Sequence, residues 1–353
     1  MKKNHPSRIH FGSCSSQHLK QPLWPAIIER KAQAFIWAGD AVYGDGHDGR
    51  HVAPATPEKL AADYNWMLQS NEGYNHLMES NVTIVGAWDD HDYGVNNGDR
   101  TYPHKRESAT LFVDFIERSN LQGNKWPLMR QRAESGDGVY GVVVFDFDRE
   151  NVLLSDVEAG IDPDVEPNTT PLSTKSVAVF LIDVRSQKSP WSRDGIKTDY
   201  QGDFLGEKQW KWLEAALQRS TASVNILVSG LQVHPDRFIS GKVAEEWSRF
   251  PMAQHRLYQA LLQSNVQSPL IVSGDVHMGE FLRRDCKIVG EYSTVAPMRT
   301  LIEMTTSGMT HSWGTYFCSR PEQWNPVCRY RYLQRVLGKL CIYSDRLSLD
   351  RLD

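Results

Sequence analysis

The stretch VTIVGAWDDHD (residues 82–92) joins an apolar run directly to a cluster of carboxylates and one imidazole. Residues 82–88 have the composition of a buried strand. Because this run stops at Asp89, the strand would deliver the side chains from Asp89 onward to the rim of its sheet. Strands alternate with helical segments along the chain, which predicts an α/β sandwich with its sites at the carboxyl edges of the sheets.

Three other segments, far apart in the chain, also end an apolar run in residues that bind cations. They are FGSC (11–14), WAGDAVY (37–43) and SGDVH (273–277). Carboxylate, imidazole, phenolate and thiolate groups bind hard and borderline metal ions. One Asp–His pair after a strand is equally well explained by a helix cap or a turn. Four such clusters at strand ends predict a site with more than one metal ion.

Each of these segments also has a plainer interpretation. Asp40 and Tyr43 would converge if the chain turned helically after Asp40, but a helix cap and a packed tyrosine are equally possible. Asp275 and His277 alternate, so both would lie on one side of an extended segment; the alternative is a hydrogen-bonded core histidine. Cys14 is either an inert buried thiol or a thiolate stabilised by a cation.

The stretch WDDHDYGVNN (88–97) carries an unusual density of charge. Asp89, Asp90 and Asp92 would repel one another unless a cation compensates them or solvent screens them. A solvated acidic loop is the plainer interpretation. The apolar run directly before the cluster favours burial, and therefore a metal site.

Other candidates are less specific. Arg185 follows a buried strand in LIDVRS (181–186), where it could donate two parallel hydrogen bonds to a phosphate or pair with a structural carboxylate such as Asp183. His234 is a weaker candidate because it lies farther from its strand end. Packing and capping are the expected roles of Glu245, Trp247 and Pro251.

The apolar pattern outlines the rest of the fold. It predicts strands at residues 9–12, 34–38, 82–88, 139–145, 152–154, 177–182, 224–228, 270–272, 281–282, 288–292, 300–304 and 340–343. Helices are expected at about residues 23–31, 57–69, 103–118 and 207–218. Thr56 followed by Pro57 is a typical start for the second of these helices. No linker divides the chain, so a single domain over residues 1–353 is expected.

Composition excludes some classes of function. The net charge of −4 gives no general attraction to nucleic acid or to acidic membranes, and no apolar run reaches membrane-spanning length. The start, MKKNHPSRIHF, has no apolar stretch behind its charges, so a cytoplasmic location is expected unless an export leader was trimmed. Five cysteines argue against a fully paired framework, although Cys318 and Cys328 could pair in an exported protein.

Taken together, the motifs resemble those of the alkaline-phosphatase-D (PhoD-like) family of calcineurin-like metallophosphoesterases. The resemblance rests on GSC, GD-x-x-Y, WDDH with a paired Asn, D-x-R and SGDVH, and extends to LG-x-x-Q-x-x-WL (205–213) and TTSGMTHSW (305–313). It implies a four-layer sandwich of two mixed β-sheets flanked by helices.

The resemblance also implies a site that holds a ferric ion together with calcium ions, although the same donors would accept zinc or manganese. Cys14 and Tyr43 would bind iron, and Asp40 would bridge metals. Further ligands would be Asp89 or Asp90, Asn97, Asp275 and His277. Arg185 would face the phosphate, and His91 would lie near the leaving group.

The implied reaction is hydrolysis of a small phosphate ester, a monoester or a diester, by in-line attack of a metal-bound hydroxide. A hydrolase of another ester or amide bond on the same scaffold, or a non-catalytic metal-containing binding module, is the alternative. Residues 44–57 and 187–204 are expected to wall the pocket, with side chains suited to a phosphorylated organic group at Trp191, Arg193, Lys197 and Tyr200.

Overall fold

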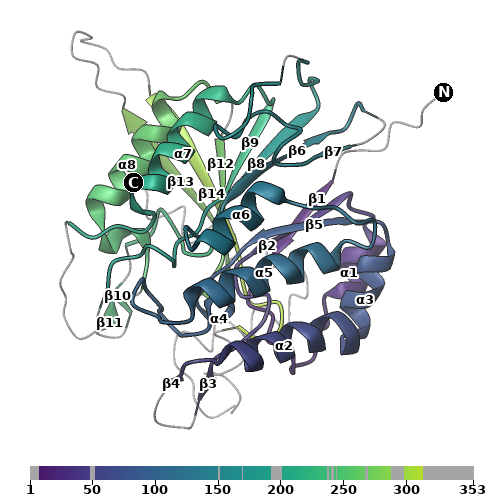
Figure 1. Ribbon diagram of the computed structural model, residues 1–353. Coiled ribbons are helices and arrows are strands. Elements are labelled where there is room, and N and C mark those ends of the chain that lie inside the picture. Colours follow the sequence, from purple (N-terminus) through teal and green to yellow (C-terminus); the bar gives the residue numbers. More distant parts are fainter. Residues whose placement is uncertain are drawn as a thin grey trace, which may run out of the picture.

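Two β-sheets face each other in this protein, and helices cover their outer faces (Figure 1). The computed structural model describes residues 8–47, 52–149, 152–168, 170–191, 201–236, 238–239, 242–243, 245–266, 269–287 and 298–312. The predicted α/β sandwich of four layers is therefore confirmed.

The smaller sheet has three strands in the order β1-β2-β5, namely β1 (Ile9–Gly12), β2 (Ala34–Ala38) and β5 (Thr83–Ala87). All of its pairings are parallel. The resemblance implied a mixed sheet here. The described sheet is parallel because each connection between its strands contains a helix that returns the chain to the same edge.

The larger sheet is mixed and has the order β13-β14-β12-β9-β8-β6-β7. Its strands are β6 (Gly141–Asp146), β7 (Leu153–Leu154), β8 (Ser176–Leu181), β9 (Val224–Ser229), β12 (Pro269–Ser273), β13 (Gly279–Lys287) and β14 (Met298–Thr306). The central strands β8, β9, β12 and β14 are parallel to one another. Two short hairpins lie outside both sheets: β3 (Gly46–His47) with β4 (Val52–Ala53), and β10 (Phe238–Ile239) with β11 (Lys242–Val243).

Helices complete the outer layers (Figure 1). On the side of the smaller sheet are α1 (Trp24–Glu29), α2 (Pro57–Ser70), α3 (Glu72–Glu79) and α5 (Lys105–Ser119). On the side of the larger sheet are α7 (Gly206–Arg219) and α8 (Pro251–Gln263). The remaining helical segments are α4 (Asp90–Tyr93), α6 (Pro127–Ser135) and the 3-10 helix η1 (Trp247–Arg249).

The two faces of the larger sheet belong to different cores. In β8, Val179 and Leu181 pack in the core shared with the smaller sheet, whereas Ala178 and Phe180 pack in the core that contains α7 and α8. This is the alternation of a strand covered on both faces. The larger sheet is therefore packed on both faces, and this packing positions its strand ends.

The strands predicted within the described residues are all present, but several helices were not predicted. These are α3, α4, α6 and α8. The first contains Gly73, and α6 is largely polar, so the sequence signal for each is weak. Packing stabilises them instead, through Tyr74 and Leu77 in α3 and Met129 in α6.

The described residues contain neither a membrane-spanning helix nor a disulfide bond. Within them, no helix combines the length and apolar character needed to cross a lipid bilayer. Cys14 and Cys286 are free thiols, whereas Cys318, Cys328 and Cys341 lie outside the described residues, as do the predicted strands 288–292 and 340–343.

Gly86 lets β5 approach β2 closely. A Cβ at Gly86 would lie 2.5 Å from the Cβ of Trp37 and 3.0 Å from its carbonyl oxygen. We expect Gly86→Ala to lower the free energy of unfolding by about 1–3 kcal/mol through overpacking, measured by urea denaturation. Gly141→Ala is the matched control in another buried strand, since its nearest contact is the terminal methyl of Met129 at 3.4 Å. Equal losses in the two variants would contradict this explanation.

Asp156 caps α6 from a distant loop. Its Oδ2 accepts from the backbone N–H groups of Leu128 and Met129, both at 3.0 Å, while Oδ1 has no hydrogen-bond partner among the described residues. Burial raises the pKa of Asp156 from 3.8 to about 6. Between these values the native state binds a proton that the unfolded chain has released, so stability falls as the pH rises through this range.

We therefore expect Asp156→Asn to remove this pH dependence. The amide keeps an oxygen for both N–H groups and never ionises. The variant should be more stable than the unmodified protein at pH 8, by about 1–3 kcal/mol, and lose that advantage at pH 4. Urea unfolding at the two pH values measures the difference. A constant difference at both pH values would show that Asp156 does not titrate in this way.

Candidate active site

The predicted site residues gather at one edge of the sandwich. Cys14, Asp40 and Asp89 come directly or nearly directly after β1, β2 and β5 of the smaller sheet. Asp275 follows β12 of the larger sheet. Because parallel strands end at a common edge and the two sheets face each other, segments far apart in the sequence meet there.

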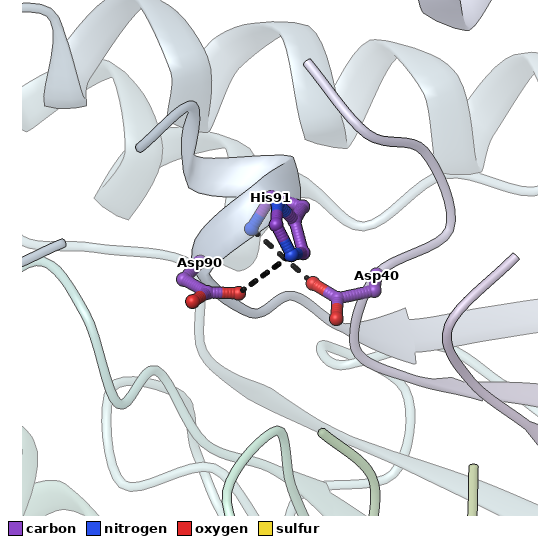
Figure 2. Close-up of side chains that lie close together, drawn as sticks. All are labelled: Asp40, Asp90 and His91. Carbon is purple, nitrogen blue, oxygen red and sulfur yellow. Dashed lines mark hydrogen bonds and ion pairs between the residues drawn. The ribbon is translucent and has the colours of Figure 1, made fainter. Parts of the chain in front are cut away.

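Within the described residues, two overlapping groups of side chains could hold a metal ion. The first is Asp40, Asp90 and His91, shown in Figure 2, and the second is Asp89, Asp90 and Asp275. Within each group, the possible ligand atoms lie within 4.8 Å of one another. Asp90 belongs to both groups, so a cation in either would be bound beside the other.

The carboxylates of Asp89 and Asp90 are buried with part of their hydrogen-bonding capacity unused. Oδ2 of Asp89 and Oδ1 of Asp90 have no hydrogen-bond partner among the described residues. The Asp90 Oδ1 atom lies 3.8 Å from Nε2 of His91. A buried carboxylate oxygen without a partner is costly, and a bound cation would satisfy it. The residues present therefore fit a metal site.

Electrostatics in the cluster support the same conclusion. Burial raises the pKa of Asp40 and of Asp89 well above the ordinary range and that of Asp275 to about 8, and the charge of Asp90 adds to all three shifts. Burial acts on Asp90 in the same direction, but His91 and Arg185 outweigh it and lower its pKa to about 2. A cation would relieve the repulsion that raises the first three values.

The backbone at the site is held in an unfavourable conformation. Left-handed φ angles occur at seven non-glycine residues of the described chain, and five of these are predicted ligands: Cys14 (57°), Asp40 (52°), Asn97 (56°), Asp275 (69°) and His277 (55°). Each costs about 1 kcal/mol or more and persists only where the surroundings impose it. Such strain is typical of functional sites, and nothing in the sequence indicated it.

Cys14 and Asp40 are in direct contact. The Cys14 thiol donates to Oδ2 of Asp40 at 3.4 Å, and Ser307 donates to the Cys14 Sγ at 2.9 Å. Burial raises the pKa of Cys14 to about 11. A thiol with such a pKa ionises near neutral pH only beside a strong positive charge, so Cys14 would act as a ligand only with a cation present.

Tyr43 and two histidines form the next part of the site. The Tyr43 hydroxyl lies 3.1 Å from Nε2 of His277, and the Tyr43 ring stacks on His91 with centroids 3.9 Å apart. The ring of His311 lies 4.3 Å from that of His277. Burial lowers the pKa of His277 to about 3 and that of His311 to about 4, so both rings are neutral. Sequence analysis gave His311 no role, although it lies in the quoted TTSGMTHSW segment.

His91 has a carboxylate partner that sequence analysis missed. Its Nδ1 lies 2.5 Å from Oδ1 of Asp45, which is 8 % exposed. Since a carboxylate only accepts, Nδ1 carries the hydrogen and Nε2 faces Asp90. Burial would lower the pKa of His91, but Asp90 and Asp45 together raise it. Asp45 follows no strand, so no pattern marked it.

The loop that follows α4 is built around Asp90. The backbone N–H of Asn97 donates to Oδ2 of Asp90 at 2.7 Å, and that of Asn96 donates to Asp45 at 3.0 Å. Of the two adjacent asparagines, Asn97 is therefore the one whose backbone contacts the carboxylate cluster. Asp92, by contrast, accepts from the backbone of Ala41 at 3.2 Å and of Val42 at 3.1 Å, so it holds the Asp40 loop in place.

Arg185 occupies the second of its two expected roles. Its side chain is fully buried, Nε donates to Oδ1 of Asp89 at 2.6 Å, and Nη1 donates to Glu245 at 2.9 Å. The contact of Arg185 with phosphate stays a prediction. Glu245 was expected only to pack or to cap a helix. It instead forms an ion pair with Arg185. Trp247 is buried and Pro251 begins α8, as predicted.

Other sequence candidates lie apart from the cluster or outside the described residues. His234 Nδ1 lies 3.1 Å from the Tyr258 hydroxyl and its Nε2 lies 3.3 Å from the Leu301 carbonyl oxygen. Burial lowers the pKa of His234 to about 4, which makes it a neutral core histidine. Trp191 packs against the core that contains α7 and α8. The expected pocket residues outside the described part are Arg193, Lys197 and Tyr200.

Comparison with known proteins agrees with this geometry. The model of the family described as PhoD-like phosphatase matches residues 174–322. This part of the chain therefore resembles the PhoD-like phosphatase family. The matched residues contain Arg185, Asp275 and His277 from the larger-sheet side of the site, while the ligands of the smaller sheet precede them. The description of that family as phosphatases favours hydrolysis of a phosphoric ester.

The fold is shared with a solved structure. A solved structure titled "Structure of PhoD" matches with a TM-score of 0.54 and 15% sequence identity. The match covers 86% of this chain and 56% of that chain, so the chain spans little more than half the length of the solved PhoD chain. At this identity the likeness shows the fold. No curated protein sequence matches the chain significantly.

Proposed function

We propose that this protein is a metal-dependent hydrolase of small phosphate esters, monoesters or diesters, with its active site at the shared edge of the two sheets. The observation that carries the proposal is the pair of overlapping metal-binding groups joined by Asp90. The orphaned carboxylate oxygens of Asp89 and Asp90 support it. The match of residues 174–322 to the PhoD-like phosphatase model supports a phosphoric ester as the bond that is cleaved.

The ligands divide by chemistry. Cys14, Tyr43 and Asp40 are the donors for a trivalent ion, because thiolate and phenolate require its high charge to ionise at neutral pH. Iron(III) is our assignment there. The remaining donors are mostly oxygen atoms and suit calcium, although they would also accept zinc or manganese. These donors are Asp89, Asp90, Asn97, Asp275 and His277. When bound, these ions activate a water molecule and neutralise the phosphate.

The protein's own residues orient the reaction. His91 is held by Asp45 on one side of its ring and stacks on Tyr43, which fixes its plane. Asp45 and Asp90 raise the pKa of His91. With Nδ1 held by Asp45, Nε2 of the protonated ring is the nitrogen that would give its proton to the leaving alkoxide. His277 and His311 remain neutral, and so can accept hydrogen bonds or bind a metal without adding charge.

The test measures metal content and turnover together. Purified protein is analysed for bound elements and assayed with a chromogenic phosphate monoester and diester, then again after chelation and after reconstitution with iron and calcium, zinc, or manganese. We expect bound metal, and activity that chelation abolishes and one of the metals restores. Metal binding without turnover of either ester would favour the binding module, and turnover only of carboxylic esters or amides would favour the other hydrolase.

A further inference from the structure

Four charged side chains beside the metal-binding groups are almost completely buried. Asp89, Arg185 and Lys188 are 0% exposed and Glu245 is 4% exposed. We call this set the buried charge network. Buried ion pairs contribute little to stability compared with apolar residues of similar size, because both charges lose their hydration. A network of this kind beside a site is therefore more readily explained by positioning than by stability.

The network is a continuous chain of contacts. Arg185 contacts Oδ1 of Asp89 through Nε and Nη2, both at 2.6 Å. Its Nη1 donates to Oε2 of Glu245 at 2.9 Å, and Lys188 pairs with Oε1 of the same carboxylate. Counted as formal charges, the two cations of the network therefore match its two carboxyl groups. The charges of Asp40, Asp90 and Asp275 are left outside this balance, available to cations.

Both cations of the network also hold the loop that carries Asn97. Nζ of Lys188 donates to the carbonyl oxygens of Asn97 at 2.9 Å and Gly98 at 3.1 Å, and Nη1 of Arg185 donates to that of Gly98 at 3.3 Å. Asn97 is one of the residues with a left-handed backbone, and its N–H donates to Asp90. The network thus fixes the strained turn that orients the shared carboxylate.

We propose that Arg185, Lys188 and Glu245 are positioning residues for the metal site. Arg185 binds one oxygen of Asp89 and so leaves the other, Oδ2, to a metal. Lys188 fixes the Asn97 turn, and Glu245 restrains both cations. The inference deepens the proposed function and rests on it. Under this proposal, Arg185 contacts only protein groups and does not contact the phosphate.

Removal of the Glu245 charge should weaken metal binding specifically. Nη2 of Arg185 already lies 3.9 Å from Oδ2 of Asp90. Without Glu245, the unbalanced guanidinium would be drawn toward Asp90 and would compete with a cation for it. Changes to residues that orient metal ligands commonly weaken affinity about 10–100-fold. We expect that range for Glu245→Gln, with little change in KM once the site is saturated with metal.

The experiment measures dissociation constants of Ca²⁺ and Mn²⁺ by calorimetry on the metal-free, full-length chain. Asp162→Asn is the matched control, because Asp162 is also fully buried and pairs with a buried arginine, Arg132, at 2.7 Å. We expect weaker binding in Glu245→Gln and unchanged binding in Asp162→Asn. Thermal unfolding of both variants separates this effect from a general loss of stability.

A second variant covers the case in which Glu245→Gln does not fold. Lys188→Met combined with Glu245→Gln restores the charge balance. If Glu245→Gln folds, the double variant should bind metal more tightly than that single variant. It should bind metal more weakly than the unmodified protein, because the Asn97 turn is released. Unmodified affinity in a folded variant lacking the Glu245 charge would overturn the inference. A raised KM in metal-saturated Arg185→Lys would assign the arginine to the substrate instead. Failure of the unmodified protein to bind either ion would instead count against the proposed function.

Discussion

Asp90→Asn is expected to remove most metal binding and to lower kcat/KM about 1000-fold or more, equivalent to at least about 4 kcal/mol of transition-state stabilisation. The carboxylate is the member shared by both metal-binding groups. The amide can still accept from the Asn97 N–H, so the loop should keep its shape. What is lost is the charge and the free Oδ1 atom. Elemental analysis and assays with both phosphate esters measure the two effects.

The control for this variant is Asp156→Asn, which makes the same change at a buried carboxylate that caps α6. We expect that control to keep its metal content and its activity. A folded Asp90→Asn protein with full metal content and full activity would show that the catalytic centre lies elsewhere. Loss of activity with metal retained would mean that Asp90 acts on the substrate and not as a ligand.

His91→Asn is expected to lower kcat about 100-fold or more for an alkyl phosphate, the range typical of a lost general acid. The loss should be much smaller for an aryl phosphate whose leaving group is acidic, because such a group departs without a proton. The physical basis is the fixed orientation of the ring between Asp45 and Tyr43. Steady-state kinetics with the two kinds of ester, together with metal analysis, measure the dependence on the leaving group.

Asp45→Asn provides the companion measurement. Because Asp45 only orients His91, its variant should show the same dependence on the leaving group with a smaller loss. Equal losses for alkyl and aryl esters in His91→Asn, accompanied by loss of metal, would assign His91 to the ligand set with Asp40 and Asp90 instead.

The sequence correctly placed candidate metal donors at the common edge of the sheets wherever a donor directly follows a buried strand. Asp89 and Asp275 were found in this way, since the end of an apolar run marks the edge of a sheet. Asp45 and Glu245 were missed as members of the site because each lies in a loop. The partners they contact, His91 and Arg185, are 46 and 60 residues away in the chain. No local pattern encodes such a contact.

Helix predictions failed for a related reason. The short helices α3 and α6 were not predicted, because short helices gain their stability from the apolar surface they bury and less from intrinsic propensity. Buried residues such as Tyr74 and Met129 provide that surface. Helix α8 was also not predicted, although it spans 13 residues and its buried Leu257 and Leu261 have helical spacing. A helix that depends on its neighbours leaves only a faint signal in its own residues.

By itself, the sequence determined the α/β class, the strand ends and the types of donor at each of them, because burial and strand periodicity act over a few neighbouring residues. Tertiary structure alone decided which donors meet, that Asp90 is shared, and that Arg185 is held by Asp89 and Glu245. It also decided the left-handed backbone at five predicted ligands. The physical reason is that these features depend on packing between two sheets, which no single segment of the chain contains.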